Sequence, residues 1–245
     1  MCAHEADPYE AKPHEAEIED FRRKRVIRLL AEDGWLAVTG LHWLDAGAND
    51  LPIGTVTLEG NVARIGTETI PFEPALLRRG GQTWQVIRRG DAVAVRVRDP
   101  AARPVFAGLD YFPIDAEWRI VADFITYDPP RVLPVVYATG QESTQASPGA
   151  ARFTVDGREF RLDATVDGSQ LFFIFADETT GYETYGAGRF VYADMPASGQ
   201  VVLDFNRAIN PPCALTDFAT CPMVPAQNRL ALRITAGEKR PRDPG

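Results

Sequence analysis

The chain contains 245 residues, of which 45% are hydrophobic, and its 26 basic and 34 acidic residues give a net charge of −8. This length and composition suit one large or two small globular domains with a sizeable core. The acidic balance argues against nucleic acids and anionic membranes as partners, because basic surfaces bind both. No apolar run approaches the roughly 18 residues of a membrane-spanning helix.

The N-terminal residues predict a short tail followed by a helix. Residues 1–12 are polar, and we expect them to be disordered. Pro13 suits the first position of a helix, and apolar residues then recur at near-helical spacing up to Leu30. Acidic residues precede basic ones, as the helix dipole favours, and Gly34 suits the C-terminal cap. We therefore expect a helix over residues 13–34, with its Arg and Lys cluster on a solvated face.

The N-terminus also bears on location. It has neither the basic start nor the apolar stretch of a secretory signal peptide, so we expect a cytoplasmic protein. Three cysteines in a chain of this length do not form a disulfide framework.

Short strand-like runs separated by glycine-containing turns occupy residues 35–99. Gly60-Asn61 and Gly90-Asp91 are typical two-residue hairpin turns. This stretch predicts a small β-unit.

A proline-rich connector at residues 100–113 introduces a second series of strands. Asp156-Gly157 and Asp167-Gly168 are further hairpin signals. We expect a mainly β protein in which residues 100–239 form an antiparallel β-barrel-like or sandwich domain, followed by a short tail at 240–245. The expected strands of this domain are 118–125, 132–138, 151–155, 159–165, 170–175, 189–193, 201–205 and 230–235.

Three groups of residues carry a family resemblance. The first is Gly-Trp-Leu and Gly-Leu-His-Trp-Leu within residues 34–49, and the second is Asp-Glu-Thr-Thr-Gly through Gly-Ala-Gly-Arg within 177–189. The third is Leu-Asp-Phe-Asn-Arg-Ala-Ile-Asn-Pro-Pro-Cys, Thr-Cys-Pro, Asn-Arg-Leu and Ala-Gly-Glu within 203–238. Together they resemble the bacterial and archaeal domain-of-unknown-function family 1684 over roughly residues 18–239. The resemblance implies no activity, and Ile209 stands where that family usually has tyrosine.

Polar side chains gather in two stretches of the second domain, residues 177–189 and the C-terminal loop at residues 203–221, and mostly apolar strands lie between them. Turn-forming residues combine there with side chains suited to fixed hydrogen bonds, so we expect the two stretches to meet around one polar pocket closed by the Cys213–Cys221 loop. Arg189 would organise it, because a guanidinium needs an acceptor: Asp204, Glu178, a loop carbonyl or a ligand anion. The alternative is that the Asp and Asn side chains only bond loop backbone. The candidate ligand-binding residues are Arg189, Asp204, Asn206, Asn210, Cys213 and Tyr185.

Cys213 and Cys221 share one loop, so we expect their side chains to lie close together. They would be packed reduced thiols, a reversible disulfide or metal ligands. Two sulfurs alone do not complete a tetrahedral zinc site, and we predict no metal.

Three classes of function remain open. The first is binding of a small molecule in a β-barrel pocket. The second is an enzyme, although the sequence contains no G-x-S-x-G, P-loop or H-E-x-x-H motif. The third is a structural or interaction module without a ligand. The sequence specifies neither a cofactor nor an oligomeric state. The candidate catalytic residues are Cys213, His42, Asp177, Glu178 and Asp204.

Overall fold

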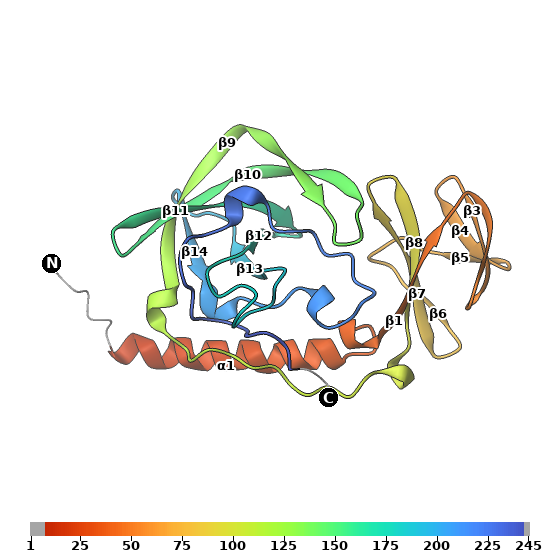
Figure 1. Cartoon of the computed structure of the whole chain (residues 1–245), viewed down its shortest axis with the longest axis horizontal. Coiled ribbons are helices and arrows are strands. Elements are labelled where there is room, and N and C mark those ends of the chain that lie inside the picture. The colour runs from red at the N-terminus through yellow and green to blue at the C-terminus, as the bar shows by residue number, and fades with distance from the viewer. Residues whose placement is uncertain (1–7, 243–245) are drawn as a thin grey trace.

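The structure is a computed structural model that describes residues 8–242, and Figure 1 shows its three parts: a long helix, a small β-unit and a barrel-like sheet. This arrangement confirms the predicted mainly β fold with an N-terminal helix. Residues 1–7 and 243–245 of the two predicted tails lie outside the described residues. Within the described part, no helix combines the length and apolar character needed to cross a bilayer.

Helix α1 (Pro8–Leu30) begins before the predicted Pro13, so residues 8–12 are helical and not a disordered tail. Pro8 also suits a first helical position, and Pro13 is accommodated inside the helix. The helix ends before Gly34, whose N–H donates to the Ala31 carbonyl at 2.9 Å. A Cβ at position 34 would lie 2.4 Å from the Leu29 carbonyl oxygen, so glycine is required there.

The β-unit consists of two four-stranded antiparallel sheets that share one hydrophobic core. Gly60 and Gly90 adopt positive φ in hairpin turns, which confirms both predicted turns. One sheet has the order β1 (Val38–Leu44), β8 (Ala92–Arg98), β7 (Gln82–Arg89), β6 (Leu77–Arg79). The other has the order β2 (Gly47–Leu51), β3 (Gly54–Glu59), β4 (Val62–Ile65), β5 (Glu68–Ile70).

Six antiparallel strands form the larger sheet, which curls until its outer strands contact each other and leave a nearly closed barrel. Asp156 and Gly157 both have positive φ in the β10–β11 hairpin, as a type I′ turn requires. The order is β13 (Arg189–Asp194), β12 (Gln170–Phe175), β11 (Arg158–Asp167), β10 (Glu142–Val155), β9 (Arg119–Val136), β14 (Gln200–Asp204).

Strand β9 merges two strands that the sequence predicted separately, at 118–125 and 132–138. Its pairing with β10 passes from Arg131 opposite Ser147 to Thr126 opposite Gly149, so residues 127–130 have no partner in that ladder. Pro129 and Pro130 fall within this gap, where a missing N–H breaks no ladder bond. The predicted strand at 230–235 is absent: those residues are irregular and tie to the barrel through individual bonds.

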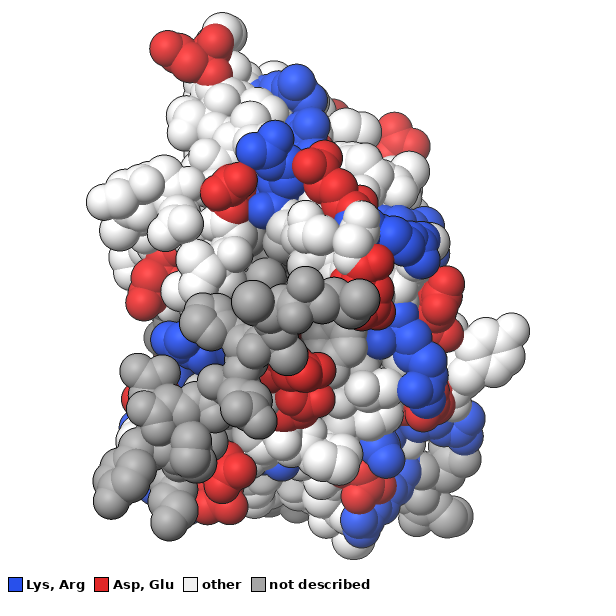
Figure 2. Space-filling view, turned by 90° about the vertical axis from the view of Figure 1, so that its left-hand side faces the viewer, with Lys and Arg blue, Asp and Glu red and all other residues white. Residues whose placement is uncertain are grey.

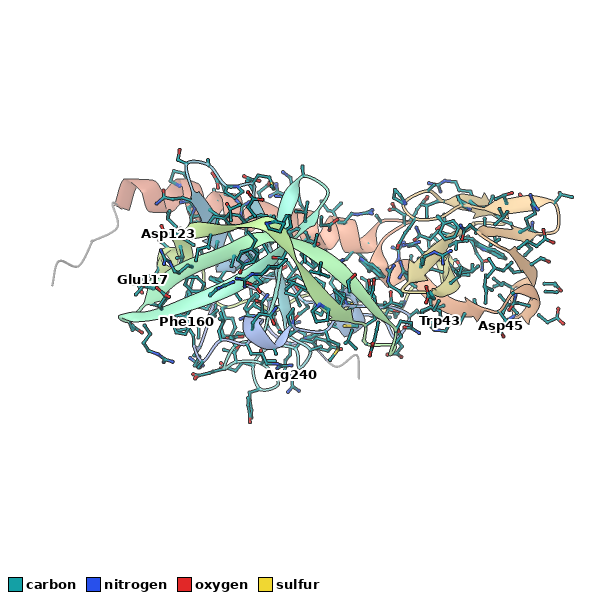
Figure 3. The ribbon with its side chains drawn as sticks, turned by 90° about the horizontal axis from the view of Figure 1, so that it is seen from above. Trp43, Asp45, Glu117, Asp123, Phe160 and Arg240 are labelled. Carbon is teal, nitrogen blue, oxygen red and sulfur yellow. The ribbon has the colours of Figure 1, made fainter. Side chains whose placement is uncertain are left out.

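Aromatic and aliphatic side chains fill the barrel interior. Phe205 lies at its centre, with ring centroids 6.2 Å from Trp118, 5.9 Å from Phe153 and 5.3 Å from Phe175. The interior is therefore a packed core. Viewed from above in Figure 3, Glu117, Asp123 and Phe160 lie at the barrel end of the molecule, whereas Trp43 and Asp45 lie in the β-unit.

On the face shown in Figure 2, acidic and basic side chains are interspersed.

Helix α1 runs along one side of the barrel and reaches toward the β-unit (Figure 1). Ile18 and Leu29, both fully buried, anchor it there.

Replacing Phe205 by alanine should lower the free energy of unfolding by about 3–5 kcal/mol, because it leaves a cavity among three aromatic rings. Urea unfolding followed by far-UV circular dichroism measures this loss. Phe218→Ala is the matched control, since Phe218 is 37% exposed and should cost much less. Equal losses in the two variants would contradict the packed-core account.

Candidate functional site

Arg189, at the first position of β13, joins the C-terminal segment to the barrel. Its side chain is 0% exposed, and Nη2 lies 3.2 Å from Asp177 Oδ1 and donates to the Ile234 carbonyl at 3.1 Å. Nη1 donates to the Ala236 carbonyl. The expected carboxylate partner was Asp204 or Glu178, and this expectation was wrong. Antiparallel pairing places Phe175 opposite Arg189, which brings the end of β12 and Asp177 beside the guanidinium.

Glu238 extends this buried network to the helix. Its Oε1 accepts from Arg25 Nε at 3.1 Å, and its Oε2 accepts from the Asn210 backbone N–H at 2.7 Å. Arg25 Nη2 also donates to the Asn210 carbonyl at 3.0 Å. Burial raises the pKa of Glu238, whereas Arg25 and the Asn210 amide oppose that rise. Glu238 thus fixes the position of Asn210 relative to Arg25.

The inner face of α1 carries polar side chains, among them Arg22 and Arg25 of the cluster that the sequence assigned to solvent. Arg22 donates to the Phe112 carbonyl at 2.9 Å, and His14 Nε2 lies 2.8 Å from Asp204 Oδ2. Arg23, Lys24 and Arg28 are exposed, so the solvated-face prediction holds for them alone. The spacing is the signal that could have revealed the others, since one helix face contains residues at intervals of three and four. That face consists of His14, Ile18, Arg22, Arg25 and Leu29.

A pocket of about 360 Å³ lies where α1, the barrel, the loop after β14 and β7 of the β-unit meet; we call it the rim pocket. The Cys213–Cys221 loop contributes one of its walls through Thr220 and Cys221. Of the predicted ligand-binding residues, Asn210 is the one that lines it. The complete lining is Arg25, Trp35, Arg89, Asp167, Phe190, Tyr192, Ile209, Asn210, Pro212, Thr220, Cys221 and Pro222.

Two guanidinium groups line the rim pocket. The Arg25 side chain is 11% exposed, and the Arg89 side chain is 16% exposed. Arg89 donates from Nε to Thr220 Oγ1 at 2.8 Å and from Nη1 to Glu73 at 2.6 Å. Among the side chains that the structure describes, no hydrogen bond uses Nη1 of Arg25 or Nη2 of Arg89. Each arginine is therefore held in place while keeping donors available.

Asn210 also lines this pocket. Its backbone binds Glu238 and Arg25, and its Nδ2 donates to the Lys239 carbonyl at 2.7 Å. Its Oδ1 is buried and has no hydrogen-bond partner within the described residues. A buried acceptor without a partner costs about 1–3 kcal/mol, so a donor that reached this oxygen after a turn of the Asn210 side chain would recover up to that amount.

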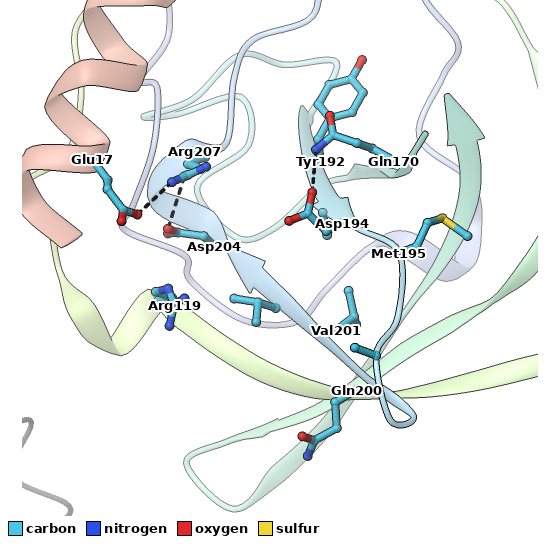
Figure 4. A pocket seen from close by; sticks show the side chains of 13 residues that line it. Glu17, Arg119, Gln170, Tyr192, Asp194, Met195, Gln200, Val201, Asp204 and Arg207 are labelled. Carbon is cyan, nitrogen blue, oxygen red and sulfur yellow. Dashed lines mark hydrogen bonds and ion pairs between the residues drawn. The ribbon is translucent and has the colours of Figure 1, made fainter. Parts of the chain in front are cut away.

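A second pocket, of about 370 Å³, lies beside Asp204 and is shown in Figure 4. Its charged groups are largely satisfied by one another: Arg207 lies 3.3 Å from Glu17 and 3.6 Å from Asp204, and Gln170 donates to Asp194. Asp204 also accepts from the Asn206 backbone N–H at 3.1 Å. The side chain of Arg119 also lines this pocket and has no hydrogen-bond or ion-pair partner within the described residues, but it is exposed, and Arg207 is 39% exposed. Neither guanidinium is therefore shielded from solvent as Arg25 and Arg89 are.

The remaining predicted residues hold the loop in place. Asn206 bonds both the N–H and the carbonyl of Asp115, and the Tyr185 hydroxyl donates to the Cys213 carbonyl at 2.9 Å. The two cysteines are close, as expected: the Cys213 N–H donates to Cys221 Sγ at 3.2 Å, and both are free thiols. The two polar stretches do meet, but at Arg189 they meet in a buried contact and not in a pocket.

The candidate catalytic groups are dispersed. His42 lies on β1 of the β-unit and lines neither pocket, and burial lowers its pKa. Asp177 is fully buried against Arg189, and Glu178 lines a separate depression near Trp118. Within the described residues, no three His, Cys, Asp or Glu side chains cluster as a metal site would require.

Replacing Arg189 by lysine should lower the free energy of unfolding by about 3 kcal/mol or more, because one ammonium cannot serve Asp177 and the carbonyl oxygens of Ile234 and Ala236 together. Urea titration measures the change. The control is Arg152→Lys, whose exposed pair with Asp123 should contribute less than about 1 kcal/mol. A similar small loss in both variants would show that the buried network does not hold the C-terminal segment.

The comparisons with known proteins identify a family. A family model described as "Protein of unknown function (DUF1684)" matches residues 104–239, more than half of the chain. No curated protein matches. The solution NMR structure of an uncharacterized protein from gene locus rrnAC0354 of Haloarcula marismortui is 31% identical, covering 55% of this chain and 77% of that chain with a TM-score of 0.46. The chain belongs to the DUF1684 family of proteins of unknown function.

Proposed function

We propose that the protein binds a small organic acid in the rim pocket, with the carboxylate held by Arg25 and Arg89. The observation that carries this proposal is the pair of largely buried guanidinium groups in one pocket, each with unpaired donors. Guanidinium groups match the geometry of carboxylates and hold them through charge-assisted hydrogen bonds. Because neighbouring acids already fix both arginines, little side-chain entropy would be lost when the ligand binds.

The walls of the pocket favour a ligand with an apolar body. Trp35, Phe190, Tyr192 and Ile209 line it beside the arginines. Its volume of about 360 Å³ lies within the range of small-molecule sites, which combine apolar walls with a few fixed polar groups. An aromatic or branched side chain on the ligand would therefore be buried while its acid group faces the arginines.

Asn210 narrows the class of ligand that would fit the pocket. Asn210 lines the pocket and Arg25 donates to its backbone carbonyl, so in this proposal a turn of the Asn210 side chain brings its unpartnered Oδ1 toward the bound acid. A hydroxyl or amino group on the carbon next to the carboxylate would donate to it. An aromatic α-hydroxy or α-amino acid fits the three features of the pocket together.

Acidic groups near the pocket limit its net charge. Glu73 and Glu238 pair with the two arginines, and Asp167 lines the pocket but is exposed to solvent. Solvent and salt screen an exposed carboxylate strongly. In this proposal the affinity for the acid comes mainly from directed hydrogen bonds in a shielded site, and less from the long-range electrostatic field of the protein.

This site differs from the sequence expectation of a pocket inside the barrel, because side chains fill that interior. The ligand would lie outside the barrel, against the loop that contains Cys221. In this proposal Asn210 contacts the ligand, while Arg189, Asn206 and Tyr185 position the walls around it. We also propose that the protein works in the cytoplasm, and its closely spaced free thiols support a reducing compartment.

Replacing Arg89 by methionine should weaken binding of 3-phenyllactate at least about tenfold, because one charge-assisted hydrogen bond is lost. Isothermal titration calorimetry measures the affinity, and a melting curve checks that the variant is folded. Arg88→Met is the matched control: Arg88 is the exposed neighbour on β7, bonded to Asn61, and should leave the affinity unchanged. Undiminished binding to the Arg89→Met protein, or no binding to the wild type, would contradict the proposal.

The role of Asn210 is tested with three related probes. The wild-type protein should prefer 3-phenyllactate to 3-phenylpropionate, which lacks the hydroxyl, and to 3-phenyl-1,2-propanediol, which lacks the charge. In Asn210→Ala the preference for the hydroxyl should disappear while the preference for the carboxylate persists, because the two contacts are separate. A hydroxyl preference that survives the substitution would remove Asn210 from the ligand site.

A further inference from the structure

Cys213 and Cys221 lie together at the edge of the rim pocket, and the proposed function does not use their chemistry. We propose that they form a peroxide-responsive dithiol, in which Cys213 is oxidised first and Cys221 then closes a reversible disulfide. The site is a modification site in its own right and does not depend on whether the rim pocket binds an acid.

The two sulfurs are held near each other by the backbone on both sides. The Cys213 N–H donates to Cys221 Sγ at 3.2 Å. The Cys221 carbonyl accepts from the Ala138 N–H at 2.8 Å, and Ile209 pairs with Phe190 just before the loop. The ends of the loop are thus held together before any oxidation, so a disulfide would join two residues that the fold already places in contact.

Cations surround Cys221. The hydroxyl of its neighbour Thr220 accepts from Arg89 Nε at 2.8 Å and from Arg96 Nη2 at 3.4 Å. Burial lowers the pKa of Arg96 to about 10, which still leaves it charged at neutral pH. Positive charge beside a thiol favours its thiolate form, so Arg96 offsets part of the rise in the pKa of Cys221 and assists this thiol in its later attack on the oxidised Cys213.

The environments of the two thiols assign their roles. Cys213 is partly exposed, and its contact with Cys221 lowers the pKa of its thiol against the opposing effect of burial. Cys221 is buried, and both its contact with Cys213 and its burial raise the pKa of its thiol. The accessible Cys213 is therefore the attacking sulfur, and Cys221 is the resolving one.

The chemistry balances with hydrogen peroxide as the oxidant. The Cys213 thiolate attacks one peroxide oxygen, the O–O bond breaks, and hydroxide leaves and is protonated to water. Cys213 is now a sulfenic acid. The Cys221 sulfur attacks the Cys213 sulfur, the S–O bond breaks, and the leaving hydroxide takes the Cys221 proton as a second water. Two thiols are oxidised by two electrons, and one peroxide is reduced.

The test uses the full chain with Cys2 replaced by serine, so that the pair provides the two remaining thiols. The folded protein is treated with one equivalent of hydrogen peroxide, alkylated and measured by intact mass spectrometry. We expect loss of two hydrogen atoms, no alkylation, and recovery of two alkylatable thiols after dithiothreitol. Two thiols that stay alkylatable, or a sulfinic acid on Cys213 beside a free Cys221, would overturn the proposal.

Single-cysteine variants test the assignment of roles. In the same background, Cys221→Ser should accumulate a sulfenic acid that dimedone traps at Cys213. Cys213→Ser should give little trapped product under the same exposure, because the remaining thiol is buried. The reverse pattern would overturn the order of attack. Affinity for 3-phenyllactate, measured separately on the reduced protein, is the readout of the proposed function, so either idea can fail without the other.

Discussion

The fold around the candidate site depends on one buried cation, the guanidinium of Arg189. Removing a charge from water costs several kcal/mol, and the cost is offset only when the charge is paired and fully hydrogen-bonded. Asp177 and the carbonyls of Ile234 and Ala236 pair the charge and bond both Nη atoms, while Nε is buried without a partner within the described residues. These carbonyls belong to an irregular segment with no strand of its own. The ion pair therefore does what a strand ladder does elsewhere: it fixes the C-terminal segment against the barrel.

The C-terminal segment positions Glu238, and Glu238 in turn binds helix α1. Glu238 binds Arg25 of α1 and the backbone of Asn210, so three parts of the chain converge on one carboxylate. The rim pocket lies beside this point, with Arg89 contributed by the β-unit. Pockets between structural units are common ligand sites, because each unit brings groups that the others lack. The same convergence brings Cys221 to the pocket wall, beside the residue that Arg89 binds.

Local chemistry was readable from the sequence, and contacts between distant segments were not. The hairpins at Gly60 and Asp156 follow from residues that accept positive φ, and the helix follows from its spacing. The sequence also marked Arg189 and Asn210, whose residue types need fixed partners. It was right that loop carbonyls accept from Arg189 but named the wrong carboxylate, because strand register places Asp177 beside the guanidinium. Arg25 was missed because a basic cluster on a helix usually faces solvent, and only docking on the barrel buries it.

The most direct test of the central claim is a crystal of the protein soaked with 3-(4-bromophenyl)lactate, in which anomalous scattering locates the bromine. The account predicts a bromine peak in the rim pocket against the aromatic wall, with the carboxylate on Arg25 and Arg89 and the hydroxyl toward Asn210 Oδ1. The peak should be absent from crystals of Arg89→Met. A bromine bound elsewhere with the rim pocket unchanged, or the same peak in the variant crystals, would contradict it.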